Sequence, residues 1–569
     1  MAASQHTSRY RDTVLSRDEI EDLIAQGRRI VLIEGRVIKT DAWLPFHPGG
    51  EKAVLHMVGR DATNEVKAFH SEETRQFMLK YQIGRVEGAW RDFLPPIQGG
   101  VFRTKAEQEA SQRPNQKAVA VEVQEVSDSE ASRTPSPIFD VTERPVSGLR
   151  RRRSKGAVSE SSATSLSDLE LEENSPKPAV PGDERTQQEV LHDLETYPSL
   201  DPTIQSDIIH KYQLLDQRLK SEDLYSCDYR AYAVEGLRYS LLAFGFLYFL
   251  RTHHFNLSAL CLGALWHQIV FTVHDAAHLS ITHNFHIDSA IACSIASFLG
   301  GLSACWWKRN HNVHHIVTNS AEHDPDIQHM PFFAISHRFF DSLKSTYYDR
   351  VMAYDPFARF MLKYQHWAYY PILTFGRFNL YVLTWQYIFL DQGPRKGPAR
   401  WLRHLEIAGQ LFFWFWYGYL TVYRSIPTAG DRILFILISH AITMPVHAQI
   451  TLSHFAMSTA DLGVAESFPQ RMLRTTMDID CPPWLDFFHG GLQFQAVHHL
   501  FPRMPRHNLR RAQVLVREFC EDVGIPYAVY GFVEGNGKVI GHLGEIARQA
   551  RILAECAGSM SGKDVSEGH

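Results

Sequence analysis

Long apolar runs appear only after residue 230 of the chain. The runs at 239–250 and 255–273 are separated only by the letters RTHH, and those at 407–423 and 433–452 also lie close together. A membrane-spanning helix needs about 20 largely apolar residues, and about 17 is near the lower limit. We therefore predict two membrane hairpins, each made of two helices joined by a short turn.

Two weaker apolar segments lie between these hairpins. Residues 289–307 are rich in Gly, Ala and Ser, and residues 378–390 form a shorter apolar stretch. If 289–307 crossed the membrane fully, His274 and His311 would face opposite sides. We therefore predict a re-entrant or interfacial segment at 289–307 and an interfacial helix at 378–390. Together these segments predict an all-α membrane domain at 225–545 with about four transmembrane helices.

The polar first part of the chain divides into two regions. Residues 10–90 predict a small α+β domain, because RRIVLIEGRVIKT has strand composition around a turn at Glu34 and Gly35, and EKAVLHMV and NEVKAFH have the composition of short helices. Residues 98–195 are rich in Ser, Pro and charge, with too few large apolar residues to offset the entropy lost on ordering. We predict a disordered linker there, and a flexible tail at 550–569.

Composition narrows the classes of protein that fit. The net charge of −5 over 569 residues gives no indication of a nucleic-acid partner. The seven cysteines are scattered without a CxxC pair, which argues against a disulfide framework and fits a reduced compartment. The first residues, MAASQHTSRYRD, carry no apolar core, so no signal peptide is expected. The 30 histidines are the unusual feature and direct attention to metal chemistry.

Three histidine clusters, each next to an apolar segment, carry the candidate chemistry. Residues three or four apart share one face of a helix, so each cluster can present its imidazoles to one point. With two hairpins, all three clusters fall on one side of the membrane. Seven imidazoles are too many for one tetrahedral zinc and suit two first-row metal ions, although ligand type alone leaves the metal open. The clusters are HDAAH with His274 and His278, HNVHH with His311, His314 and His315, and QAVHH with Gln495, His498 and His499.

These clusters, in this order, resemble the three histidine boxes of the membrane fatty-acyl desaturases. The resemblance covers residues 230–545 and includes the stretches GGLQFQAVHHLFPRMPRHNLR and AEHDPDIQ. It implies a centre of two non-haem iron ions held by the seven box histidines. Gln495, in place of a first histidine in the third box, is similar to the front-end subgroup, which inserts a double bond between an existing feature and the head group.

The family is expected to use more iron ligands than the boxes provide. His440, His447 and His454 lie in or just after the fourth predicted span, where ionisable residues are functional candidates. His454 is nearest the expected exit side and is our candidate for an eighth histidine. Gln495 is a candidate ligand or ligand partner. Candidate hydrogen-bond partners of the ligand histidines are Asp275, Asp324 and Asp326.

The N-terminal domain contains a second metal-binding pattern. The stretch WLPFHPGGEKAVLHMVGRDATNEVKAFHS resembles cytochrome b5, which implies a haem b held by His47 and His70. Two axial histidines leave no open position for O2, so such a haem carries electrons and does not activate oxygen. His56 is a competing ligand candidate, but it lies inside a predicted helix, where we expect it to pack.

The two resemblances together predict a cytochrome b5-fusion front-end desaturase in the endoplasmic reticulum membrane. The haem domain and the histidine boxes would be cytosolic, NADH-cytochrome b5 reductase the electron donor, O2 the oxidant and a membrane lipid the substrate. The HPGG block and the long linker most resemble fungal sphingolipid Δ8-desaturases, which act on the long-chain base of ceramide or glucosylceramide. Three alternatives stay open: a Δ5 or Δ6 front-end fatty-acid desaturase, a b5-fused lipid hydroxylase, and a non-enzymatic electron donor, against which the intact boxes argue.

Overall fold

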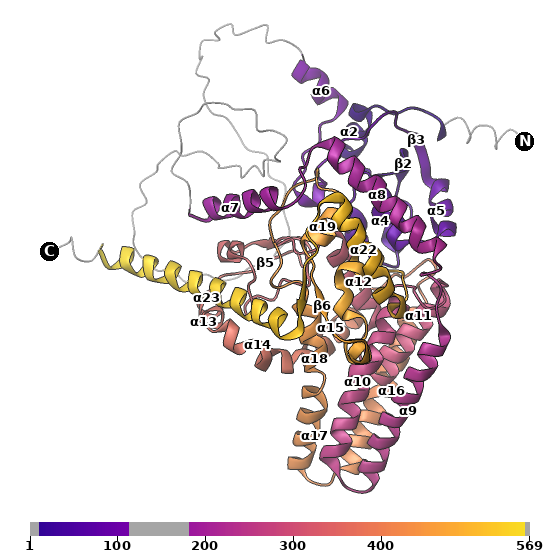
Figure 1. Ribbon diagram of the computed structural model, residues 1–569, viewed down its shortest axis with the longest axis vertical. Helices are drawn as coiled ribbons and strands as arrows, with labels where there is room; N and C mark the ends of the chain where they lie inside the picture. The colour runs from indigo at the N-terminus through magenta and orange to yellow at the C-terminus, as the bar shows by residue number, and fades with distance from the viewer. Residues whose placement is uncertain (1–10, 113–180, 564–569) are drawn as a thin grey trace, which may run out of the picture.

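The computed structural model describes residues 11–112 and 181–563. A small domain of strands and short helices is followed by a larger, mostly helical domain (Figure 1). The predicted combination of a small α+β domain and an all-α membrane domain is confirmed. The middle of the predicted linker, 113–180, lies outside the described residues.

The small domain is built on a three-stranded antiparallel sheet in the order β1-β2-β3. Glu34 and Gly35, predicted as the turn between the first two strands, have φ values of 52° and 69°. Positive φ at both central residues is the geometry of a tight two-residue hairpin. The elements are α2 Arg17–Ala25, β1 Ile30–Ile33, β2 Arg36–Lys39, α3 Glu51–Leu55, α4 Thr63–Phe69, α5 Glu72–Met78 and β3 Gln82–Arg85.

The apolar runs form long helices that extend together toward the lower end of the molecule in Figure 1. Within the described ranges, three helical segments are long and apolar enough to cross a membrane: Tyr229–Arg251 (α9), Phe255–Ala277 (α10) and Ala429–Leu452 (α17 Ala429–Ala441 with α18 Met444–Leu452). The remaining predicted span, at 407–423, falls in α16, Leu402–Phe413, and in the π-helix η7, Trp414–Ser425, that directly continues it.

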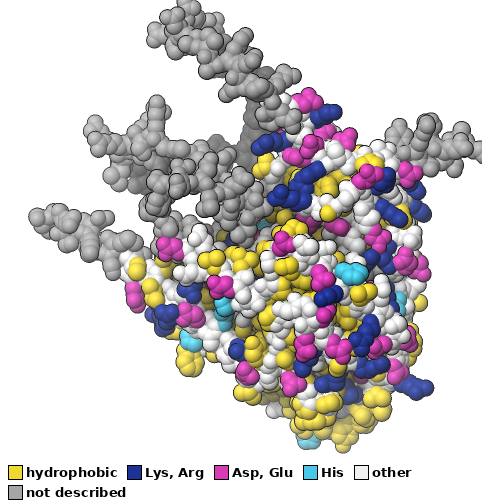
Figure 2. Space-filling model, turned by 45° about the horizontal axis from the view of Figure 1, so that its top comes forward, with side chains coloured by type: hydrophobic (Ala, Val, Ile, Leu, Met, Phe, Trp, Pro, Cys, Tyr) yellow, Lys and Arg dark blue, Asp and Glu magenta, His cyan; other side chains and the backbone are white. Residues whose placement is uncertain are grey.

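The surface of these helices is that of a membrane protein. Leu237, Leu241 and Phe244 of α9 are 63%, 62% and 66% exposed. Large exposed apolar surfaces are unfavourable in water, but hydrocarbon accommodates them. Figure 2 shows hydrophobic side chains gathered at the lower end of the molecule, whereas charged side chains are spread over the surface above it.

The segment predicted to be re-entrant turns back on itself. It consists of α11 Phe285–Cys293, the π-helix η5 Ser294–Leu299 and α12 Ala304–Ile316, with a bend of 119° before α12. The rings of His278, before this segment, and His311, within α12, are only 5.1 Å apart. The chain therefore enters and leaves on the same side, as the sequence predicted.

The rest of the large domain forms a cap above the long helices. Its largest hydrophobic core joins α8, α19, α21 and α22, so the domain begins before residue 225. Two small sheets pair β4 with β5 and β6 with β7. The cap elements are α8 Pro202–Ser221, β4 Lys344–Ser345, β5 Arg350–Val351, α13 Pro356–Lys363, α14 Gln365–Thr374, α15 Gly376–Phe389, α19 Phe468–Arg474, β6 Asp478–Asp480, α20 Asp486–His489, α21 Gln495–Leu500, α22 Leu509–Val523, β7 Val529–Gly531 and α23 Phe532–Lys563.

Two predicted boundaries are wrong. Both ends of the segment predicted as a linker at 98–195 are helical, as α6 Lys105–Gln112 and α7 Pro181–Thr196. The second of these helices is fixed by Asp193, which is buried and pairs with Arg474 at 2.8 Å. The tail predicted at 550–569 is helical up to Lys563, as the continuation of α23, which buries an apolar stripe against the cap before this point. This stripe consists of Val539, Leu543, Ile546 and Ala550.

Candidate metal and haem centres

Three helices bring the box histidines together at one place. His274 lies in the last turn of α10, and His278 ends that helix. His498 of α21 is 4.6 Å from His274 and 4.7 Å from His278 between ring centroids. His499 is 4.1 Å from His315 of α12. All seven box histidines predicted from the sequence are therefore collected from α10, α12 and α21 into one cluster.

Within this cluster, the potential ligand nitrogens form two groups. In each group, nitrogen atoms from all members lie within 4.8 Å of one another. The first group is formed by His274, His278, His311 and His498, and the second by His314, His454 and His499. Because each group contains three or more imidazoles facing one point, the arrangement fits two metal ions better than one.

His315 lies between the two groups. Its ring centroid is 4.5 Å from that of His311, 4.8 Å from that of His498 and 4.1 Å from that of His499. Its Nε2 is 3.0 Å from the Nε2 of His311. This imidazole is therefore close enough to serve either ion.

The buried nitrogens test whether a metal fits here. Among the described residues, the Nε2 atoms of His274, His278, His498 and His499 are buried without a hydrogen-bond partner. An unsatisfied buried polar atom costs about 1–3 kcal/mol. Burial also lowers the pKa of His278, His498 and His499 well below the usual value, so these rings are neutral. Neutral imidazoles with free nitrogens in one place have the chemistry that a metal ion requires of its ligands.

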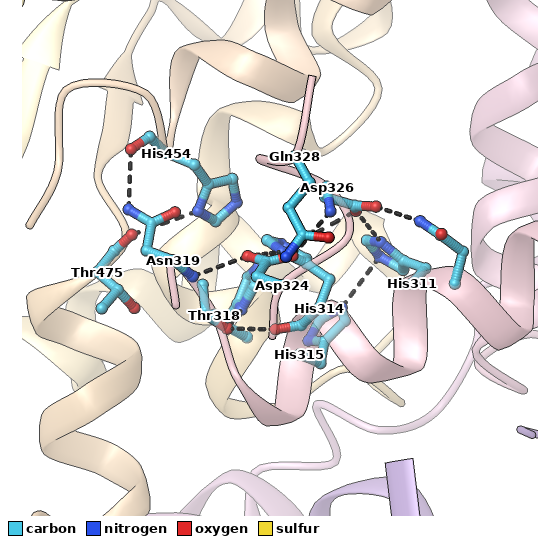
Figure 3. A network of polar contacts seen from close by, with 12 residues as sticks. His311, His314, His315, Thr318, Asn319, Asp324, Asp326, Gln328, His454 and Thr475 are labelled. Carbon is cyan, nitrogen blue, oxygen red and sulfur yellow. Dashed lines mark hydrogen bonds and ion pairs between the residues drawn. The ribbon is translucent and has the colours of Figure 1, made fainter. Parts of the chain in front are cut away.

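Two aspartates orient the histidines of α12 (Figure 3). His314 Nδ1 donates to Asp324 Oδ2 at 2.8 Å, and His311 Nδ1 donates to Asp326 Oδ2 at 3.3 Å. A ligand histidine commonly donates its second ring N–H to a carboxylate, which fixes the tautomer. Burial by itself would raise the pKa of Asp326, but the nearby His314 and the hydrogen bond from His311 lower this pKa below its usual value. The backbone N–H groups of Asn319 and Asp326 donate hydrogen bonds to the carboxylate of Asp324 at 2.7 and 2.8 Å.

Asp275 has a different environment from the other two predicted aspartates. It accepts hydrogen bonds from Arg506 and from the hydroxyl of Tyr232, while its Oδ1 lies 3.9 Å from His274 Nδ1. Arg506 also bonds Glu235 and donates to a carbonyl of α10. This buried network joins the first box to the segment after the third box. Sequence reasoning singled out the stretch that contains Arg506 but gave that residue no role.

The structure places His454 with the second group. Its ring lies 4.6 Å from that of His314 and 4.9 Å from that of His499, and its Nδ1 is 3.3 Å from the carbonyl oxygen of Thr475. Gln495 is buried at the first residue of α21, one turn before His498. Its function as a ligand or ligand partner stays a prediction.

Other candidates near the fourth span lie elsewhere. His440 stacks on Phe378 at 4.4 Å, and its two ring nitrogens lie near the carbonyl of Ile436 and the hydroxyl of Tyr381. His447 packs against Gly376. These contacts are those of histidines that hold helices together.

Two contacts at the centre were not predicted. Trp307 stacks on the ring of His311 at 4.3 Å. Thr318 donates to the carbonyl of His314 at 2.7 Å, and its hydroxyl lies 3.4 Å from His499 Nδ1. Trp307 precedes His311 by one helical turn, a spacing that the sequence could have indicated.

In the small domain, His47 and His70 face each other as haem ligands would. Their ring centroids are 6.0 Å apart. Their Nδ1 atoms are bonded to the carbonyls of Gly50 and Val66, at 2.8 and 3.2 Å, which leaves Nε2 free on each ring. Because imidazole binds a metal at about 2 Å, two rings on opposite sides of one iron are about 6 Å apart. The pair therefore fits a haem with two axial histidines.

The third histidine of this domain faces another way. His56 Nδ1 lies 2.9 Å from Gln98 Nε2, and its ring packs against His323 of the large domain at 5.3 Å. Burial lowers the pKa of His56 well below the usual value. These contacts assign it to packing between the two domains.

Comparison with known proteins identifies a family for each of the two domains. The family model described as fatty acid desaturase matches residues 252–531, which include all three boxes. The model described as cytochrome b5-like heme/steroid binding domain matches residues 16–87, which include His47 and His70. The resemblances inferred from the sequence are confirmed.

Two of the relatives match almost the whole chain, and a third matches about half of it. A protein of Emericella nidulans named Delta 8-(E)-sphingolipid desaturase is 58% identical over 562 residues, 99% of each chain. A protein of the same name from Candida albicans is 44% identical, over 95% of this chain and 97% of the relative. The Arabidopsis thaliana protein named Delta(8)-fatty-acid desaturase 2 is 40% identical over 299 residues, 52% of this chain and 64% of that relative.

Proposed function

Because the chain belongs to the fatty acid desaturase family, we propose that it introduces the Δ8 double bond into the long-chain base of ceramide or glucosylceramide. The observation that carries this proposal is the 58% identity, over 99% of both chains, to a protein named Delta 8-(E)-sphingolipid desaturase. That name specifies the (E) isomer, so we propose a trans double bond. The electrons come from the fused cytochrome b5-like domain.

The proposed reaction requires two kinds of iron, a haem iron and non-haem iron. His47 and His70 would hold haem b, and the two histidine groups around His315 would hold two non-haem irons. When bound, the non-haem irons supply the oxidising power for removing two hydrogens from neighbouring methylene groups. Overall, O2, two electrons and two protons are consumed, one C–C single bond becomes a double bond, and two waters form.

The protein residues prepare this site. Asp324 and Asp326 hold His314 and His311 in one tautomer through their Nδ1 atoms, which directs Nε2 away from the carboxylates. His315 and His499 are fully buried, so the middle of the histidine cluster is shielded from water. Such a site protects a strongly oxidising reaction from competing proton and water chemistry.

The proposal includes a partner and a location. We propose NADH-cytochrome b5 reductase as the donor to the haem domain, and the endoplasmic reticulum membrane as the site, with both centres cytosolic. The contact between the small domain and α12 supports a common side for the two centres. The seven free cysteines are compatible with a reducing environment on that side.

A reconstituted reaction tests the chemistry and the substrate class together. Purified full-length protein with NADH, the reductase and O2 is given ceramide or a phospholipid with the same acyl chains. We expect a new double bond in the long-chain base of ceramide and no product from the phospholipid. A Δ5 or Δ6 acyl product would assign the alternative front-end activity, and a hydroxylated base would assign a hydroxylase. The matched control is the His311→Ala variant, which should form no product.

A further inference from the structure

The helix that carries the second histidine box has two functional faces. Positions three or four residues apart lie on the same face of a helix. On α12, His311, His314 and His315 form the face directed at the metal centre. A second set with the same spacing is directed at the haem domain: Arg309, Asn312, Val313 and Ile316.

The contact at this second face is tight. A Cβ atom added to Gly49 would lie 2.3 Å from Asn312 Nδ2, and one added to Gly50 would lie 3.3 Å from Arg309 Cγ. A side chain at Gly49 would force Asn312 to move, and a side chain at Gly50 would crowd Arg309. These glycines directly follow Pro48 and the haem ligand His47 in the sequence. The HPGG turn therefore packs closely against α12.

The apolar part of the contact reaches the haem-binding core. Val313 and Ile316 of α12 share one buried cluster with Val31 and Met57 of the small domain. Phe69, the residue before the haem ligand His70, packs against the same cluster. The domains therefore share a continuous apolar core at this point.

Phe69 also touches the metal centre directly. Its ring lies edge-on to the imidazole of His315, with centroids 5.6 Å apart and an angle of 83°. His315 is the imidazole that lies between the two histidine groups. The side chain of Phe69, which directly precedes the haem ligand His70, thus reaches the middle of the non-haem site.

Polar contacts hold the small domain in this position. Lys52 donates to the carbonyl of Thr346 at 2.8 Å and pairs with Asp349 at 2.7 Å. Gln213 of α8 donates to Asn64 at 3.1 Å. These contacts join helices α3 and α4 of the small domain to the large domain, in addition to the apolar contact.

We propose that this docked arrangement is the electron-transfer complex, and that electrons pass from the haem domain to the non-haem centre through Phe69 and His315. The proposal rests on the proposed function, since that reaction needs two electrons for each double bond. A haem carries one electron, so the contact is used twice in each turnover. Phe69 is a positioning and conducting residue and does not touch the substrate.

The docking is tested first, without reference to activity. A carbodiimide joins a lysine amine directly to a carboxylate in contact with it, with loss of water. In the full-length protein we expect an amide between Lys52 and the exposed Asp349, identified by mass spectrometry of peptides. Lys67 and Glu34, which pair at 2.8 Å within the small domain, are the internal control. A Lys67–Glu34 product without a Lys52–Asp349 product would overturn the docked arrangement.

The route is tested by stopped-flow reoxidation of the reduced haem in the presence of O2 and ceramide. We expect Phe69→Leu to slow reoxidation several-fold, with the Lys52–Asp349 product and the haem spectrum unchanged. Phe69→Tyr should restore the rate because it keeps the ring. The matched control is Phe77→Leu, at an exposed phenylalanine of the same domain that is 49% exposed.

The outcomes separate this proposal from the proposed function. Reoxidation of Phe69→Leu at the wild-type rate would overturn the route and leave the desaturase assignment standing. If the Phe69→Leu variant loses haem, the Lys52→Ala variant is used in its place, with Lys67→Ala as its control. Equal reoxidation rates in the Lys52→Ala and Lys67→Ala variants would overturn the docked complex. Failure of the proposed function would appear differently, as the absence of any lipid product from wild-type protein whose haem is reoxidised normally.

Discussion

The carboxylate of Asp324 is the most enclosed partner of the histidine cluster. It is fully buried, and it accepts from His314 Nδ1 and from the backbone of Asn319 and Asp326. Such partners fix the orientation and basicity of a ligand imidazole. The chemistry of the site therefore depends on residues that do not themselves face the metals.

We predict that Asp324→Asn lowers iron affinity or activity by about 10–100-fold, because His314 loses its charged acceptor. The measurement is iron per chain by elemental analysis, together with turnover. Asp522→Asn is the control, since that carboxylate is 64% exposed and pairs only at the surface. Iron content and turnover equal to those of the control would show that Asp324 does not support the centre.

The eighth histidine gives a second prediction at this scale. His454→Ala should lose about one of the two non-haem irons, because the second group has only three members besides His315. His440→Ala removes a buried helix histidine of the same hairpin and should keep both ions. Equal iron contents in these two variants would contradict the assignment of His454.

Spacing predicted the seven box histidines, but it could not predict how they divide. Within HNVHH, His311 belongs to the first group and His314 to the second, and His315 lies between the two groups. This division depends on how α12 crosses α10 and α21, which no local pattern contains. The role of Arg506 was missed for the same reason, since its partners lie on α9 and α10.

At the level of elements, the tight turn before α12 fixes the bend of the re-entrant segment. Gly301 has a φ of 68°, and an added Cβ would lie 2.4 Å from the ring of Phe413. Arg377 bonds the carbonyl of Gly300 and lies over the ring of Trp266 at 4.0 Å. The position of the second histidine box therefore depends on a turn that has no room for a side chain.

We predict that Gly301→Ala destabilises the membrane domain by about 2–5 kcal/mol, through left-handed backbone strain and overpacking against Phe413. Gly430→Ala is the control, because the nearest atom to its added Cβ would be 4.0 Å away. Thermal unfolding in detergent measures the difference. Equal midpoints for the two variants would show that the turn tolerates a side chain.

The apolar runs were sufficient to predict the hairpins and the re-entrant segment. Composition was less reliable for the polar regions, where α7 and α23 are helices. An average over many residues hides single anchors such as Asp193, which pairs with Arg474, and the apolar stripe that includes Val539 and Leu543. These anchors stabilise helices only through contacts with distant parts of the chain.

For the whole molecule, the sequence predicted two linked domains but not how they meet. Linker composition sets how far a domain can reach and does not specify a docking face. The docking face is encoded on α12, whose Asn312 and Arg309 contact Gly49 and Gly50. One helix thereby connects the candidate electron supply with the candidate site of oxidation.

The most direct test of the account is lipid analysis of a host that lacks sphingolipid and polyunsaturated acyl desaturation, with and without this protein. We predict a new trans double bond at C8 of the long-chain base, unchanged acyl unsaturation, and loss of the product in His311→Ala and His70→Ala. A new Δ5 or Δ6 acyl double bond with an unaltered long-chain base would contradict the account.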